Sequence, residues 1–209
     1  DKTLEEFKKQ REQKKQGLTI NEFKAQRQQS KLGTGARSVL GVSSGLSPLA
    51  FETELTEQQF QKDLIKYTKE TKCCDKDNCN HPKIQSDLKI DKAFKVIDDS
   101  INNLFKSYLG TDKFEFSKKN VWSYYAPKDS ELQNVVHNHI FKKEKGLQLS
   151  GIMYITPTDL GTDFTDFKIK PEINKWYLWH SGLFHHPEDG ITPKDRMVLA
   201  LATVINRCT

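Results

Sequence analysis

A series of short β-prone segments constrains the fold of this chain most strongly. Seven of them follow Lys113 within about 95 residues, separated by turn-forming Pro, Gly, Asp and Lys. They read FEFS, NVWSYYA, VVHNHIF, LQLSGIMYIT, FTDFKI, KWYLWH and RMVLALATVI. Strands this short and this closely spaced are typical of a sandwich or barrel, and they argue against alternating β-α units.

Two helices are predicted before the strands begin. Apolar residues recur at helical spacing over about residues 56–69 and again over about residues 91–109. Because the helices precede the strands, we expect an α+β fold in which helices buttress a β core formed by the C-terminal half. The expected organisation is a basic helical arm with a Gly/Ser linker over 1–48, a helical support region over 49–112, and the β core over 113–209.

The first 37 residues carry the excess of positive charge. They hold ten Lys or Arg and five Asp or Glu, and the net charge of the whole chain is +5. The sequence from Thr3 to Arg11 is echoed from Thr19 to Arg27, and each copy begins with a capping-box pattern that predicts a short helix. Such an arm is expected either to contact an acidic macromolecule or to act as a solubilising tail.

Composition and cysteine placement favour an intracellular protein. The longest apolar run, from Met197 to Ile205, is about half as long as the roughly 20 residues needed to span a bilayer, so no membrane segment is expected. The amino-terminal residues are charged and show no signal-peptide pattern. Three of the four cysteines are clustered and are not spaced as a secreted disulfide framework, which favours the reducing cytoplasm, including that of a phage-infected host.

The clustered cysteines form one candidate metal site. Thiol and imidazole groups are zinc ligands, and four of them lie close together at Cys73, Cys74, Cys79 and His81. Their spacing differs from that of a standard zinc finger, and adjacent cysteines rarely both bind one ion. The segment is therefore expected to be either a structural zinc site or a surface loop with free thiols.

The histidines form a second candidate metal site. Five of the six lie between residues 137 and 186. His137 and His139 are two residues apart in a β-prone segment, so their side chains share one face. About 45 residues later come His185 and His186, of which only one can face inward in an extended segment. This interval suits a chain that passes round a small barrel and returns, which predicts a histidine metal site in the barrel mouth.

The order of these residues resembles a known family. The phage and bacterial 2-oxoglutarate/Fe(II) oxygenases have an H-x-H pair, then a strand reading L-S-G-x-x-Y, then a distal histidine and an arginine that begins the last strand. The corresponding residues here are His137, His139, Leu149, Ser150, Gly151, Tyr154, His185 and Arg196. The resemblance covers about residues 120–207 and does not extend to residues 1–110.

This resemblance implies a double-stranded β-helix, or jelly-roll, that works as an oxygenase. The family pattern implies that His137, His139 and His185 bind Fe(II) and that Arg196 anchors 2-oxoglutarate, because a guanidinium is always charged and binds a carboxylate with two hydrogen bonds. Tyr154 and Tyr124 are candidates for hydrogen bonds to the cosubstrate. The implied reaction is a hydroxylation that yields succinate and CO₂, and the primary substrate stays open.

One departure from the pattern leaves alternatives open. Most members of the wider superfamily have Asp where His139 stands, so either His139 is a true ligand or a carboxylate such as Glu144 supplies the missing charge. Glu144 also fits a cupin motif, H-x-H-x4-E-x6-G, which would make the protein a cupin-like metalloprotein that does not use 2-oxoglutarate. A third alternative is a non-catalytic structural or adaptor protein of a phage particle with a degenerate barrel.

Overall fold

The computed structural model describes residues 43–44, 49, 54–70, 84–87, 94–132 and 135–207. The predicted helices of the basic arm and the candidate zinc ligands Cys73, Cys74, Cys79 and His81 lie outside these residues. Two residues of the predicted linker, Ser43–Ser44, form a short strand.

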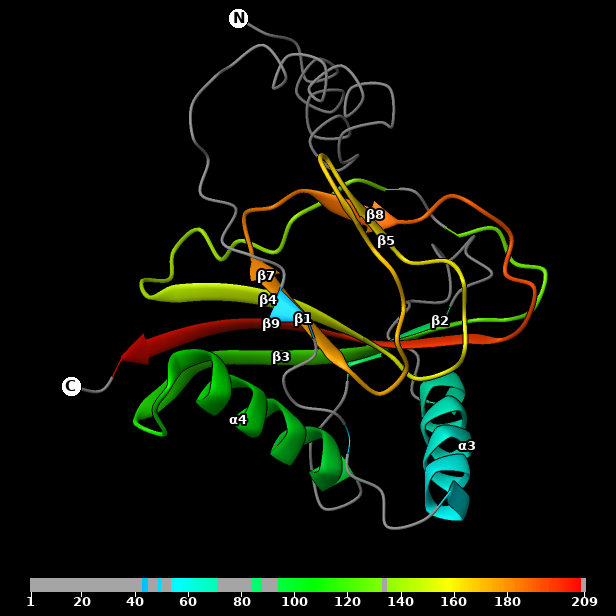
Figure 1. Cartoon of the computed structure of the whole chain (residues 1–209), viewed down its shortest axis with the longest axis horizontal. Coiled ribbons are helices and arrows are strands. Elements are labelled where there is room, and N and C mark those ends of the chain that lie inside the picture. The colour runs from blue at the N-terminus through cyan, green and yellow to red at the C-terminus, as the bar shows by residue number, and fades with distance from the viewer. Residues whose placement is uncertain are drawn as a thin grey trace, which may run out of the picture.

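The described residues form two antiparallel sheets. The large sheet has six strands in the order β1-β7-β4-β9-β3-β2. The small sheet has three strands in the order β6-β5-β8, and β5 and β8 lie over the large sheet in Figure 1. The strands of the large sheet are β1 (Ser43–Ser44), β2 (Ile84–Asp87), β3 (Phe114–Ala126), β4 (Leu147–Tyr154), β7 (Trp176–His180) and β9 (Arg196–Arg207); those of the small sheet are β5 (Thr162–Phe164), β6 (Lys168–Ile169) and β8 (His185–Pro187).

Two helices lie on the side of the large sheet that faces away from β5 and β8 (Figure 1). They are α3 (Glu54–Glu70) and α4 (Lys95–Leu109), close to the predicted bounds. Helix α4 ends at Gly110, whose φ of 68° suits glycine and lets its N–H bond to the carbonyl of Lys106 at 3.0 Å. Neither helix combines the length and apolar character that a membrane span requires. The predicted arrangement of helices against an antiparallel sheet is confirmed for the described residues.

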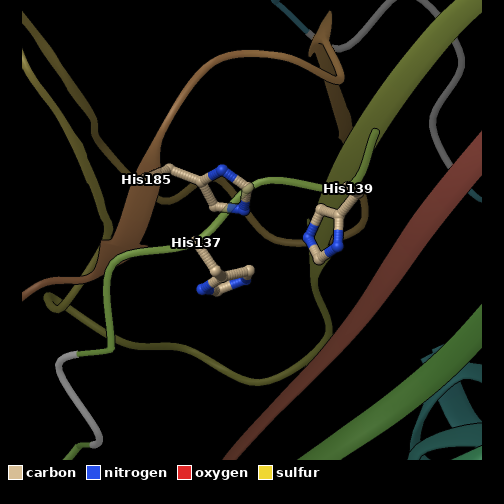
Figure 2. A group of neighbouring side chains, drawn as sticks. All are labelled: His137, His139 and His185. Atoms are coloured by element: carbon tan, nitrogen blue, oxygen red, sulfur yellow. The ribbon is translucent and has the colours of Figure 1, made fainter. Parts of the chain in front are cut away.

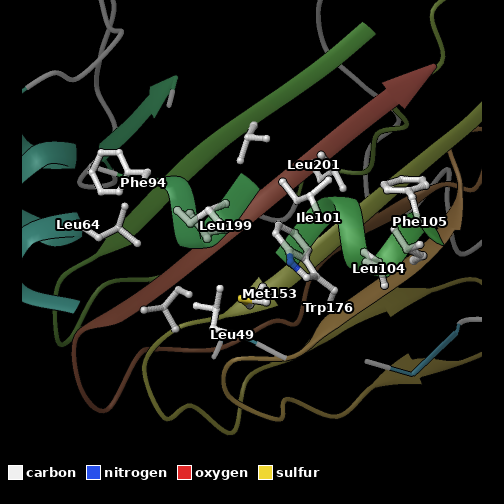
Figure 3. Close-up of a cluster of buried hydrophobic side chains, with 14 of the residues drawn as sticks. Leu49, Leu64, Phe94, Ile101, Leu104, Phe105, Met153, Trp176, Leu199 and Leu201 are labelled. Carbon is white, nitrogen blue, oxygen red and sulfur yellow. The ribbon is translucent and has the colours of Figure 1, made fainter. Parts of the chain in front are cut away.

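The hydrophobic core lies between the helices and the large sheet (Figure 3). Residues one helical turn apart in α4 supply one side, and alternate residues of the strands supply the other. Trp176 of β7 is fully buried in this core, and its Nε1 donates to Oγ of Ser100 in α4 at 3.2 Å. The labelled members of the core in Figure 3 are Leu49, Leu64, Phe94, Ile101, Leu104, Phe105, Met153, Trp176, Leu199 and Leu201.

Strand β9 shows how the large sheet divides its two faces. Met197, Leu199 and Leu201 belong to the core against the helices. Their neighbours Arg196, Val198 and Ala200 line a pocket on the opposite face, as the two-residue period of a strand requires. The same sheet therefore supports a structural core on one side and a pocket on the other.

Four predicted strands differ from those in the structure. FEFS and NVWSYYA form one strand, β3, whose register shifts between Phe116 and Lys118. FTDFKI is divided into β5 and β6. The prediction of a strand for VVHNHIF was wrong in detail, because only His137 forms a ladder pair, with His185. The backbone after His137 bonds instead to a loop and to a side chain, as described below.

Candidate metal centre and anion pocket

Three histidines come together at the edge of the small sheet (Figure 2). His137 and His139 lie on the extended segment and His185 on β8, and one ring nitrogen from each lies within 4.8 Å of the others. The backbones of His137 and His185 exchange two hydrogen bonds of 3.0 Å, which place their rings side by side. The spacing of the ring nitrogens suits a shared metal ion.

Hydrogen bonds fix which nitrogen of two rings is free. Nδ1 of His137 lies 2.7 Å from the carbonyl oxygen of Val135, and Nδ1 of His185 lies 3.0 Å from that of Leu183. A carbonyl only accepts, so each Nδ1 donates and each Nε2 keeps its lone pair. A backbone carbonyl that holds the ring in this way is typical of metal-binding histidines. The ring of His139 packs edge-on against Trp122, with centroids 5.1 Å apart.

Burial keeps the three imidazoles neutral near pH 7. It lowers the pKa of His139 to about 4 and, as the largest cause, also lowers the pKa of His137 and of His185, the last of these well below the usual value. Repulsion from His137 lowers the pKa of His139 further, and repulsion from His137 and His139 does the same for His185, because a second positive charge in the cluster is unfavourable. Neutral imidazoles bind Fe, Zn, Ni and Cu, so this donor set fits a transition metal.

The cluster opens into a pocket of about 560 Å³. The lining comes from both sheets and includes no Asp or Glu among the described residues. Arg196 is therefore its one permanently charged side chain. The lining residues are Asn120, Trp122, Tyr124, Val135, His137, His139, Gly151, Ile152, Thr162, Trp179, His185, Pro187, Arg196, Val198 and Ala200.

Arg196 has no counter-ion among the described residues. It is 2% exposed, no carboxylate pairs with it, and its Nε is buried without a hydrogen-bond partner. Burial lowers the pKa of Arg196, yet a guanidinium stays charged in proteins. The hydroxyl of Tyr124 is also buried and unpartnered, and burial raises its pKa, so it stays a neutral donor. A buried cation beside a free hydroxyl donor fits a carboxylate.

Tyr154 lies behind the pocket lining, in contact with two residues of that lining, Arg196 and Thr162. Its ring is 5.5 Å from Cζ of Arg196, and its hydroxyl shares a 2.8 Å hydrogen bond with Oγ1 of Thr162. Burial raises the pKa of Tyr154 to about 12, so the phenol is neutral. The structure thus places Tyr154 and Tyr124 close to Arg196, while their hydrogen bonds to the cosubstrate stay a prediction. Thr162, which the sequence analysis missed, also lines the pocket.

Glu144 and His186 lie apart from the histidine cluster. The carboxylate of Glu144 pairs with Nζ of Lys118 at 3.4 Å and is not among the groups that can share a metal with the histidines. His186 is as buried as its neighbour His185, but its Nδ1 lies 2.7 Å from the carbonyl oxygen of Pro187. Of the residues in the cupin motif, the histidines therefore join the cluster and Glu144 does not.

Gln148 holds the segment that carries His139 to the large sheet. Its Oε1 accepts from the N–H of Phe141 at 2.8 Å, and its Nε2 donates to the carbonyls of Phe141 and Glu144, both at 3.1 Å. The N–H of His139 bonds to the carbonyl of Ser181 at 3.0 Å. A side chain and a loop carbonyl thus replace the strand partner that the sequence predicted.

Replacing Gln148 with leucine is expected to weaken metal binding about tenfold, because partners outside the ligand sphere typically contribute 10–100-fold. The three hydrogen bonds that hold the segment would be lost while the three histidines remain. Zn(II) affinity measured by competition with a chelator provides the test. Gln61→Leu is the matched control, since Nε2 of Gln61 also ties a helix to a backbone carbonyl, that of Ile155 at 2.9 Å, far from the histidines. Equal affinities in the two variants would contradict the role of Gln148.

Comparisons with known proteins place the fold. No family model and no curated protein matches the sequence. Among solved structures, the viral collagen prolyl hydroxylase of Paramecium Bursaria Chlorella virus-1, solved with 2OG, is 12% identical, with a TM-score of 0.50 over 83% of this chain and 100% of that one. The prolyl hydroxylase of Trichoplax adhaerens, solved with a hypoxia inducible factor peptide, is 11% identical, with a TM-score of 0.54 over 90% and 94% of the chains.

A third similar structure belongs to a protein with a different reaction. SnoN, a non-heme alpha ketoglutarate dependent epimerase from nogalamycin biosynthesis, is 8% identical, with a TM-score of 0.56 over 78% of this chain and 79% of that one. At such identities the likeness concerns the fold, and one fold supports several reactions. The chain therefore has the fold of the 2-oxoglutarate- and Fe(II)-dependent oxygenases, with three histidines and a buried arginine facing one pocket.

Proposed function

We propose that the protein is an Fe(II)- and 2-oxoglutarate-dependent hydroxylase with a double-stranded β-helix core. The observation that carries the proposal is the joint presence, in one pocket, of three neutral histidines and a buried arginine. Within the part of the chain that the structure describes, no carboxylate lines this pocket or pairs with the arginine. Three neutral histidines suit a metal ion. A dianionic 2-oxo acid can bind that metal at one end and the guanidinium of Arg196 at the other.

Each residue then has a defined task. His137, His139 and His185 would hold the iron on one side and leave its other positions to ligands. Arg196 and the hydroxyl of Tyr124 would bind and orient the far carboxylate of 2-oxoglutarate. When bound, the iron and the 2-oxo acid supply the oxidising chemistry, in which O₂ converts the acid to succinate and CO₂ and a substrate C–H bond is hydroxylated. The two sheets would keep bulk water away from this chemistry.

The donor set distinguishes this site from a two-histidine, one-carboxylate triad. A carboxylate would contribute one negative charge, and no carboxylate of the described residues lies in the cluster. The proposed site therefore holds Fe(II) with neutral ligands alone. The negative charge near the metal would come from the 2-oxo acid, so binding of the metal and binding of the acid should favour each other.

The primary substrate would approach from the side of Asn120, Trp122 and Val135. These residues line the pocket, and Asn120 and Val135 are exposed. The sequence-based proposal that the basic arm contacts an acidic macromolecule is compatible with a large substrate.

An anaerobic visible spectrum of the Fe(II)-loaded protein tests the proposal. Addition of 2-oxoglutarate is expected to produce a new charge-transfer band, because the acid would bind the iron directly. Iron content must be measured in the same sample. If a sample that demonstrably holds iron shows no band, 2-oxoglutarate is not the cosubstrate. The proposal of a cupin-like metalloprotein would then replace this one.

A further inference from the structure

One buried polar atom of the pocket has no hydrogen-bond partner among the described residues and gains none from the proposed binding of iron and of the far carboxylate. Among the described residues, four buried side-chain polar atoms lack a hydrogen-bond partner, and three of them belong to residues that line this pocket. They are Oη of Tyr124, Nε of Arg196 and Nε1 of Trp179. Buried donors without partners are rare, because each forgoes its hydrogen bond to water. A ligand that completes the pocket must therefore satisfy Trp179 as well.

Trp179 lies at the metal end of the pocket. Its ring packs edge-on against His185, with centroids 4.9 Å apart, and against Phe164, with centroids 5.2 Å apart. It is 3% exposed, so bulk water does not satisfy its N–H. His185 offers no acceptor, because its Nδ1 donates to the carbonyl of Leu183 and its Nε2 faces the metal in the proposed function. The described residues thus offer the N–H of Trp179 no acceptor.

We propose that Nε1 of Trp179 donates a hydrogen bond to a carboxylate oxygen of the bound 2-oxo acid at its metal-binding end. This inference rests on the proposed function. Trp179 would thus be a binding residue for the cosubstrate, at the end opposite to Arg196. A hydrogen bond to a charged acceptor in a buried site contributes roughly 1.5–3 kcal/mol, so its loss should raise the Kd by about tenfold or more.

The three tryptophans of the chain permit a direct test by NMR. In ¹⁵N-labelled, Zn(II)-loaded protein, the indole N–H of Trp179 is expected to shift downfield and to exchange more slowly with water when 2-oxoglutarate is added. The indole of Trp176 serves as an internal reference, because it already donates to Ser100 on the other face of the same strand. Trp179→Phe and Trp176→Phe assign the two signals by their disappearance.

The same two variants give the thermodynamic test. Calorimetry with Ni(II) in place of iron should show a Kd for 2-oxoglutarate about tenfold higher in Trp179→Phe and unchanged in Trp176→Phe. Both variants lose the same atoms, but only Trp176→Phe loses an existing hydrogen bond. Without ligand, Trp176→Phe should therefore unfold at the lower temperature. A purely structural role for Trp179 would predict no difference in Kd between the variants.

The outcomes separate the two proposals. If wild-type protein binds 2-oxoglutarate, an unmoved Trp179 signal together with an unchanged Kd in Trp179→Phe overturns this inference and leaves the proposed function intact. If the metal-loaded wild-type protein binds no 2-oxoglutarate, the proposed function fails and this inference fails with it. The wild-type NMR titration gives an answer even if the variants do not fold.

Discussion

Replacement of His185 by alanine should abolish stable metal binding. His185 is 5% exposed, and its ring nitrogen completes a group with those of His137 and His139 within 4.8 Å. Loss of a direct ligand should lower the affinity by more than about a hundredfold, which exceeds the roughly 10–100-fold effect of partners outside the ligand sphere. Metal content after dialysis and calorimetric titration with Ni(II) measure the effect, and turnover should disappear in parallel.

The adjacent histidine supplies the control for this experiment. His186 is equally buried at 5%, but it is not part of the cluster. His186→Ala should therefore retain the metal, even if it lowers stability through loss of buried contacts. Metal retained by His185→Ala and lost by His186→Ala would show that the assignment of the distal ligand is wrong by one residue.

Replacement of Arg196 by methionine should have opposite effects on binding and on stability. The loss of the buried guanidinium should weaken 2-oxoglutarate binding by roughly 2–5 kcal/mol, which corresponds to a Kd about 30-fold to several thousand-fold higher. In the absence of ligand, the variant should unfold at a higher temperature than wild type, because an uncompensated buried charge is replaced by an apolar side chain. Calorimetry on Ni(II)-loaded protein and thermal unfolding of ligand-free protein measure the two effects.

Lys118→Met is the matched control for this variant. It also removes a positive charge from the large sheet, but Lys118 pairs with Glu144 outside the pocket. Its Kd for 2-oxoglutarate should equal that of wild type. An unchanged Kd in Arg196→Met would mean that the far carboxylate does not bind at this end, whatever the variant does to stability.

Much of the site could be predicted from residue type and order. The shared face of His137 and His139 follows from local chain geometry, since residues two apart on an extended segment point the same way. Arg196 was assigned through the family resemblance, in which an arginine follows the distal histidine and begins the last strand. The helices and most of the strands could be predicted from the sequence, because apolar residues recur at the helical or strand period where one face of an element is buried.

The remainder depends on contacts between distant parts of the chain, which local patterns do not encode. The segment VVHNHIF has the composition of a strand, yet its hydrogen bonds go to the side chain of Gln148 and to the loop carbonyl of Ser181. Glu144 fits a ligand motif by spacing, but Lys118 engages its carboxylate. Trp179 resembles any core aromatic residue in sequence, because an indole N–H without a partner is visible only when its surroundings are known.

The division of β9 into two faces bears on how such a protein can change over evolutionary time. Val198 and Ala200 face the pocket, whereas Met197, Leu199 and Leu201 hold the strand against the helices. Val198 also packs in a second cluster of buried apolar residues on the pocket side, whereas Ala200 does not belong to either cluster. Substitutions at Ala200 can therefore reshape the cavity while the packing against the helices stays in place. The architecture thus separates the residues that are free to explore new substrates from those that must be retained. This separation also marks Ala200 as a starting position for engineering substrate scope.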